Sequence, residues 1–207
     1  MKKVNFILLT LTFLLLFSAC KKKEIPTERR VFGQVTEFGT DIPIAEATIE
    51  LYSSGTDGIG SSTLLEKTVT TDQNGRFEMN FATEDISSVA VKADKYFDSI
   101  EHFLNPGKDN EENFVLDPHA WLHLQVKNVA PADEFDRINL SSSVSSTPGS
   151  PENLIGVEVN QNYILQKRGN RATGLYWWAY NSGILQTEHA DTILIPAHDT
   201  LYYEINY

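Results

Sequence analysis

Short β-type runs separated by turn residues recur throughout the chain after Arg30, and this spacing constrains the fold more than any other feature. No later stretch of about eleven residues shows the i, i+3, i+4, i+7 apolar spacing of an amphipathic helix without an interrupting Gly, Pro or β-branched cluster. Apolar and polar residues instead alternate, as in Thr-Ile-Glu-Leu-Tyr at 48–52. Alternation with period two is typical of half-buried strands. The pattern therefore predicts an all-β chain.

The predicted strands form two groups. The first group lies at 30–37, 47–53, 65–71, 76–81, 88–93, 97–103 and 113–116, and the second at 121–127, 136–144, 154–160, 163–167, 175–180, 192–195 and 201–206. Short strands of this kind with frequent turns favour β-sandwiches. Asp117 and Pro118 separate the groups, since proline cannot continue a strand ladder. We therefore expect two small β-sandwiches, a first module at 30–117 and a second module at 118–207.

Three sequence pieces in the first module carry a family resemblance. They are Val-Phe-Gly-Gln-Val at 31–35, Pro-Ile-Ala-Glu-Ala-Thr-Ile at 43–49, and Thr-Asp-Gln-Asn-Gly-Arg-Phe at 71–77. In the third piece, Asn74 and Gly75 suit a tight hairpin, and the side chain of Asp72 can bond the turn backbone. Together the pieces resemble the carboxypeptidase regulatory-like domain. A glycine that usually precedes the family's tyrosine is Lys95 here, before Tyr96.

That resemblance covers residues 31–97 and implies a seven-stranded, transthyretin-like sandwich with an accessory or structural role. It implies no peptidase activity, because that activity belongs to a separate catalytic domain in the family. Such domains are common at the front of exported proteins from Bacteroidota-like bacteria. The residues of the second module resemble no family that we can name.

The N-terminus has the features of an export signal. Lys2 and Lys3 precede a mostly apolar run at 6–17, and the small residues Ser18 and Ala19 stand directly before Cys20. This is the order of the charged, hydrophobic and cleavage regions of a signal peptide. The run is too short to cross a membrane as a helix, which needs about 20 apolar residues. We therefore expect residues 1–19 to be a signal peptide.

Residues 17–20, Phe-Ser-Ala-Cys, resemble the lipobox of bacterial lipoproteins, with Phe17 where leucine is usual. The resemblance implies cleavage before Cys20, lipidation of its thiol with palmitate-type chains, and anchoring in the outer membrane of a Gram-negative bacterium. Residues 20–29 would then be the lipidated cysteine and a charged tether. The lysines at 21–23, followed by one acid, leave the side of the membrane open: cell surface or periplasm.

Composition excludes several classes of partner and site. The formal net charge of −11 becomes more negative by two when Lys2 and Lys3 are removed, and phosphate binding needs a basic surface. We therefore expect no nucleic-acid partner. Cys20 is the only cysteine, so disulfides within the chain and thiolate metal sites are excluded.

Neither histidine spacing nor acidic loops indicate a metal site. His119 and His123 would lie roughly 13 Å apart on a strand, too far to share one metal. Asp72 begins a calcium-loop-like sequence, but Thr83 stands where the loop would need glutamate, which favours a hairpin turn. A weaker calcium site that combines Asp72 with acids of another loop stays open. The motifs of zinc peptidases, serine hydrolases and P-loop proteins are missing from the sequence. We expect no metal, no cofactor and no catalytic residues.

An aromatic run in the second module is the candidate ligand-binding site. Alternation along 175–180 places Tyr176, Trp178 and Tyr180 on one face and Leu175, Trp177 and Ala179 on the other. An exposed row of aromatic rings is typical of surfaces that bind sugars or proteins. Two alternatives remain open: the Ser- and Thr-rich loop at 141–152 covers the row, or Trp177 is the exposed residue.

These features predict a non-catalytic outer-membrane lipoprotein, held by lipid on Cys20, that serves as an envelope accessory or adhesion module. The second module would bind a protein or glycan through Tyr176, Trp178 and Tyr180. One alternative is a structural component of an envelope complex with no ligand of its own. A second alternative is a hydrolase whose site only folding assembles.

Overall fold

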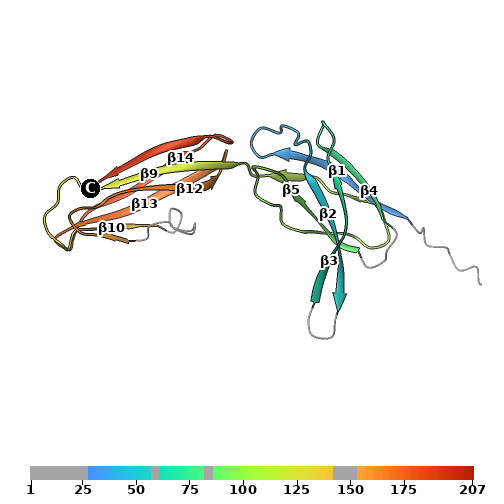
Figure 1. Cartoon of the computed structure of the whole chain (residues 1–207), viewed down its shortest axis with the longest axis horizontal. Coiled ribbons are helices and arrows are strands. Elements are labelled where there is room, and N and C mark those ends of the chain that lie inside the picture. Colours follow the sequence, from blue (N-terminus) through green and yellow to red (C-terminus); the bar gives the residue numbers. More distant parts are fainter. Residues whose placement is uncertain (1–27, 57–60, 82–85, 142–152) are drawn as a thin grey trace, which may run out of the picture.

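The computed structural model describes residues 28–56, 61–81, 86–141 and 153–207. The regular structure in this part of the chain consists of β-strands. It includes no helix that could span a membrane. The all-β class predicted from the sequence is confirmed. The strands form four sheets in two modules, which lie end to end along the long axis of the molecule (Figure 1).

One sheet of the first module is built around β1 (Arg29–Glu37). β4 (Arg76–Phe81) pairs with it antiparallel, whereas β7 (Asn110–Glu111) and β8 (Phe114–Leu116) pair with it in parallel. The other sheet has the order β3 (Ser61–Thr70), β2 (Thr48–Thr56), β5 (Ile86–Lys92) and β6 (His102–Phe103). The two-residue β7 is the strand that the sequence did not predict.

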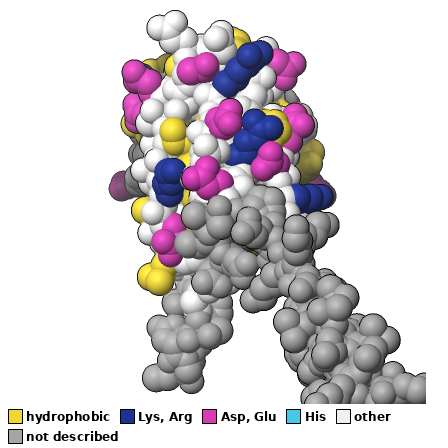
Figure 2. Space-filling model, turned by 90° about the vertical axis from the view of Figure 1, so that its right-hand side faces the viewer, with side chains coloured by type: hydrophobic (Ala, Val, Ile, Leu, Met, Phe, Trp, Pro, Cys, Tyr) yellow, Lys and Arg dark blue, Asp and Glu magenta, His cyan; other side chains and the backbone are white. Residues whose placement is uncertain are grey.

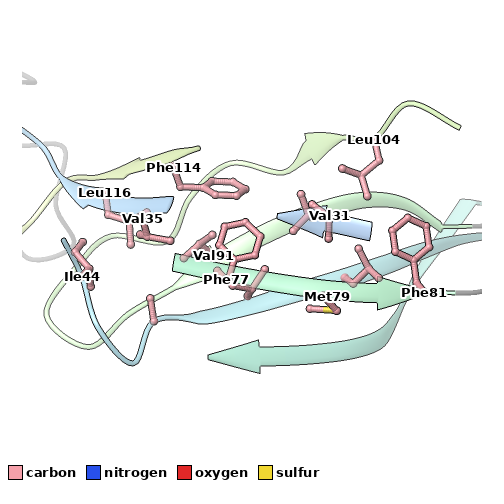
Figure 3. Close-up of a cluster of buried hydrophobic side chains, with 14 of the residues drawn as sticks. Val31, Val35, Ile44, Phe77, Met79, Phe81, Val91, Leu104, Phe114 and Leu116 are labelled. Atoms are coloured by element: carbon pink, nitrogen blue, oxygen red, sulfur yellow. The ribbon is translucent and has the colours of Figure 1, made fainter. Parts of the chain in front are cut away.

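The first core lies between these two sheets. β4 alternates strictly, with Phe77, Met79 and Phe81 buried and the residues between them exposed. Figure 3 shows these three side chains meeting Val31 and Val35 of β1. The remaining buried members are Ile44, Ala47, Ile49, Leu51, Ile86, Val89, Val91, Leu104, Phe114 and Leu116. Burial of this many large apolar side chains, each worth about 1.5–3 kcal/mol, stabilises the first module without disulfides.

A tight turn forms before β4 at the residues that the sequence predicts, but it closes no hairpin, because β3 and β4 belong to different sheets. One carboxylate oxygen of Asp72 accepts hydrogen bonds from the backbone N–H groups of Asn74 and Arg76, both at 2.8 Å. Gly75 takes a φ of 69°, which favours glycine. Asp72 therefore acts as a turn residue, and the backbone N–H of Val35 donates to the carbonyl of Gly75 at 2.8 Å, which ties the turn to β1.

The second module packs a three-stranded sheet against a four-stranded sheet. The three-stranded sheet has the order β12 (Asn160–Arg168), β9 (His119–Lys127) and β15 (Thr200–Asn206), and β15 runs parallel to β9. The four-stranded sheet has the order β11 (Asn153–Ile155), β10 (Arg137–Leu140), β13 (Ala172–Asn181) and β14 (Ile184–Leu194). Its core is separate from the first and consists of Ala120, Leu122, Leu124, Val126, Ile138, Leu140, Val159, Leu165, Leu175, Trp177, Ile193, Ile195 and Ile205.

Three strand predictions were wrong in extent. Residues 154–160 were expected to be one strand, but Gly156 has a φ of 110° and the chain turns there between β11 and β12. Residues 97–103 contribute only the two-residue β6. β14 is eleven residues long instead of four. It is an edge strand, and its largely exposed residues do not alternate between apolar and polar, so the sequence pattern does not reveal its full length.

A buried carboxylate joins the two modules. Asp117 forms ion pairs with Arg168 and Arg171 of the second module, and its side chain is only 7% exposed. The guanidinium of Arg171 also lies 3.8 Å from the ring centre of Phe38, and that of Arg168 lies 5.1 Å from the ring centre of Phe97. Each arginine therefore contacts a carboxylate and an aromatic ring of the first module.

A second polar cluster lies at the same junction. Glu37, buried at the end of β1, accepts hydrogen bonds from the Tyr96 hydroxyl at 2.9 Å and from Thr40 at 2.9 Å. The Nε2 atom of His198, from the second module, lies 3.2 Å from the same carboxylate. Burial and the hydrogen bond to Glu37 raise the pKa of Tyr96 well above its usual value. These contacts hold the modules in a fixed relative orientation.

Candidate binding face of the second module

The outward face of β13 carries the aromatic row, defined as Tyr176, Trp178 and Tyr180. Leu175, Trp177 and Ala179 are buried, with exposed fractions of 0%, 7% and 4%. Tyr176 is 45% exposed, and Trp178 and Tyr180 are half-buried. The structure therefore places the row on the outer face of the four-stranded sheet and Trp177 on the inner face.

A glycine sets the orientation of Tyr176. Gly174 lies two residues earlier on the same face of β13, and a Cβ built on it would lie only 2.6 Å from Cε2 of the Tyr176 ring. The ring therefore lies back along the strand over Gly174, close to the sheet. A ring in this position presents its other face outward, as stacking against a ligand requires.

Polar side chains of β10 flank the aromatic row. The strand register sets Arg137 opposite Tyr180 and Asn139 opposite Trp178. The guanidinium of Arg137 lies 4.1 Å from the ring centre of Tyr180, a cation–π contact. Nε of Arg137 and Oδ1 of Asn139 are both buried without a hydrogen-bond partner. They become available to a ligand only if neighbouring side chains move.

The inner side of β13 is fixed by a second set of contacts. Trp177 stacks on His189 of β14 with ring centres 4.1 Å apart, and its ring lies edge-on to Tyr203 of β15. The Tyr203 hydroxyl donates a hydrogen bond of 2.6 Å to Asp191. Burial and this bond raise the pKa of Tyr203 to about 12, and the bond lowers the pKa of Asp191. β13 therefore offers its outer rings on a rigid support.

The histidines considered for a metal site have other contacts. His119 lies against Phe97 at the junction, with ring centres 4.7 Å apart, and His123 lies against Tyr202, at 4.8 Å. Burial and the nearby His198 lower the pKa of His119. No group of three or more metal-ligating side chains converges within the residues that the structure describes.

Two sequence predictions fall on residues for which the structure gives no placement. Cys20, the predicted lipidation site, lies outside the described residues, as does the predicted loop at 141–152 except for Ser141. The backbone N–H of Ser141 donates to the carbonyl of Tyr176, so the chain leaves β10 beside the aromatic row.

Comparison with known proteins gives no family for this chain. No family model matches it, and no curated protein matches it. The solved Bacillus anthracis TIE protein is 8% identical, with a TM-score of 0.34 over 87% of this chain and 34% of that one. A Streptococcal ancillary pilin is 14% identical, with a TM-score of 0.35 over 87% of this chain and 62% of that one. GBS52, a minor pilin of Streptococcus agalactiae, is 13% identical, with a TM-score of 0.39 over 86% of this chain and 94% of that one. The chain thus spans about a third of the TIE protein and less than two thirds of the ancillary pilin. Similarities this remote support no conclusion about function.

Proposed function

We propose that the chain is a non-catalytic lipoprotein of the outer membrane, anchored through Cys20, that acts as an envelope accessory or adhesion module. The second module binds a glycan or protein ligand through Tyr176, Trp178 and Tyr180. One observation carries this proposal: alternation along β13 buries Trp177 and turns the other three rings outward on one rigid strand.

The chemistry of the face favours sugar rings. The C–H faces of a pyranose pack against aromatic rings, and tyrosine and tryptophan supply contact area with few rotatable bonds to order. Tyr176 lies over Gly174, and Tyr180 is held by Arg137, so both rings are ordered before a ligand arrives. Pre-ordering reduces the entropy lost on binding.

The first module serves as a spacer and scaffold. β1 begins at the end of this module that is opposite the second module, so the tether at 20–29 joins the fold there (Figure 1). Figure 2 looks onto that end of the molecule, where acidic and basic side chains are interspersed. The junction contacts of Asp117 and Glu37 then hold the second module in line with the first.

A glycan array tests the proposal. The unlipidated Cys20→Ser chain, its Tyr176→Ala variant and a Tyr202→Ala control are each applied to the array. Tyr202 is matched in type, is 73% exposed, and lies on the other sheet of the same module. We expect a signal from the parent chain that Tyr176→Ala weakens and Tyr202→Ala leaves unchanged. Equal signals from both variants, or none from the parent chain, would count against glycan binding by this face.

A second candidate function is that of a structural component of an envelope complex. The outer face of the three-stranded sheet favours it, because Ile164 and Tyr202 lie there with exposed fractions of 70% and 73%. Chemical crosslinking in cells separates the candidates. A structural component gives a stoichiometric crosslinked complex and no glycan signal.

A further inference from the structure

The end of the second module opposite the junction is formed by three connections between strands. They are the β9–β10 loop at 128–136, the β11–β12 turn at 156–159, and the β13–β14 turn at 182–183, which together we call the distal tip. The strand registers bring them together, since Lys127 pairs with Asn160 and Arg137 pairs with both Ile155 and Tyr180. Figure 1 shows these connections at the end where the chain terminates.

Large apolar side chains are exposed on the distal tip and at the strand ends that lead into it. They are Val129 (53%), Phe135 (62%), Ile155 (62%), Val157 (39%), Ile184 (66%) and Leu185 (48%). Single exposed apolar residues are ordinary on a protein surface. Six from three separate chain segments, gathered at one end of one sandwich, indicate an interaction surface.

The distal tip is also hollowed. One hollow of about 410 Å³ is lined by residues 154–159 together with Glu134 and Gln161. A second, of about 250 Å³, is lined by Asn128, Asp136, Tyr180 and Tyr207 among others. Hollows flanked by exposed apolar groups can accept side chains of a protein partner.

One buried carboxylate holds the three connections together. Asp136, 1% exposed, accepts hydrogen bonds from the backbone N–H of Ala132 at 2.7 Å and the side-chain amide of Asn128 at 3.0 Å. Its other oxygen accepts from the N–H of Ser182 at 2.9 Å. Its own carbonyl accepts from the N–H of Gly156 at 2.8 Å. The distal tip is therefore ordered before any partner binds, which lowers the cost of association.

The charges around the apolar groups define the partner. Glu134 and Glu158 are exposed and border the larger hollow, and Asp133 lies beside Glu134. Lys127 and Arg137 directly flank the β9–β10 loop, and the guanidinium of Arg137 rests on the ring of Tyr180. An acidic rim repels an anionic bilayer surface and a second copy of the same acidic surface. It attracts a protein whose apolar patch is bordered by lysine or arginine.

We propose that the distal tip is a docking site for a protein that presents an apolar patch bordered by basic residues. This site meets the aromatic row only at Tyr180, and it does not depend on glycan binding by that row. Its position opposite the end at which β1 begins makes it the part of the described chain that reaches farthest from the tether (Figure 1).

Site-specific photo-crosslinking tests the docking site in cells that produce the lipidated full-length chain. A photoreactive phenylalanine replaces Phe135 or Ile184 at the distal tip, or Phe103 as a comparably exposed control on β6 of the first module. We expect the same crosslinked protein from 135 and 184 and none from 103. That protein, purified, should bind the purified chain, and Glu134→Lys with Glu158→Lys should weaken binding at least tenfold.

Raising the salt concentration from about 0.05 M to 0.5 M should also weaken this binding, because the rim charges are exposed and screened by salt. Thermal unfolding of the charge-reversal variant checks its fold. Four results would overturn the proposal: crosslinks at 103 equal to those at the tip, a crosslink only to a second copy of the chain, binding to vesicles of phosphatidylglycerol instead of protein, or a partner unaffected by the charge reversal.

Discussion

The carboxylate of Asp117 is paired with the guanidinium of Arg171, so the last residue of the first module is tied directly to the second. Asp117 is almost fully buried, whereas the side chain of Arg171 is 45% exposed and rests on Phe38. Arg168 pairs with the other carboxylate oxygen. The orientation of the two modules therefore depends on this acid and its two bases, together with the cluster of Glu37, Tyr96 and His198.

Replacing Asp117 with alanine should loosen the junction while both modules stay folded. The change removes both ion pairs, worth on the order of 2 kcal/mol because the arginines are half exposed. NMR relaxation should then give the modules separate tumbling times. The control is Asp109→Ala, which removes an ion pair with Arg30 inside the first module, far from the junction. Equal tumbling times for both modules in Asp117→Ala would contradict the role of this pair.

In the Asp136→Asn variant, the free energy of unfolding should fall less between neutral and acidic pH than it does in wild type. Backbone N–H donors of Ala132 and Ser182 lower the pKa of Asp136 below its ordinary value of 3.8. The stability that the Asp136 carboxylate contributes to the fold is therefore fully present above about pH 4. It declines as pH falls toward the folded-state pKa of Asp136, because this carboxylate takes up its proton in the unfolded chain first. Urea unfolding from pH 7 to pH 3 should show wild type and variant converging at low pH. A difference in the free energy of unfolding that stays constant from pH 7 to pH 3 would show that the protonation of Asp136 is not linked to stability.

Gly33→Ala should strongly destabilise the first module. A Cβ at Gly33 would lie 1.8 Å from the carbonyl oxygen of Glu112, so the backbone of the segment that links β7 to β8 must move. We expect a loss near the upper end of the overpacking range, about 3 kcal/mol. Gly107→Ala is the comparison: nothing lies within 4 Å of its Cβ, and only its φ of 84° is unfavourable. Similar losses in both variants, measured by urea unfolding, would exclude the crowding argument.

Strand positions were predictable from the sequence where burial is one-sided. β4 was predicted at its observed bounds, because Phe77, Met79 and Phe81 alternate with exposed residues after a turn that Asp72 and Gly75 define. The orientation of the aromatic row followed from the same period-two rule. β14 was mostly missed, since eight of its first nine residues are exposed and show no periodic apolar pattern.

The junction and the distal tip were not predictable, for a different reason. Asp117 meets Arg168 and Arg171 across separations of 51 and 54 residues, which no local pattern encodes. Phe135 and Ile184 lie at the same end of the module only because of the strand order β11-β10-β13-β14. In the sequence alone, basic residues and isolated apolar residues at these positions cannot be distinguished from ordinary surface residues. Only the strand topology shows which of them lie close together.

Cys20→Ser should release the chain from the membrane. Two or three acyl chains give durable anchoring, because each buried methylene contributes about 0.8 kcal/mol, and loss of the thiol removes the attachment point. Ultracentrifugation of lysed cells should find wild type in the membrane pellet and the variant in the soluble fraction. Both in the pellet would mean that the membrane holds the chain by some other contact.

Calorimetric titration of the best array glycan into the Cys20→Ser chain tests the binding function most directly. Parent, Trp178→Ala and Trp121→Ala chains are compared, since Trp121 is also half-buried but lies on the other sheet. The account predicts at least a tenfold weaker affinity for Trp178→Ala, about 1.4 kcal/mol, and an unchanged affinity for Trp121→Ala. Unchanged affinity in Trp178→Ala, with its fold intact, would contradict binding through the aromatic row.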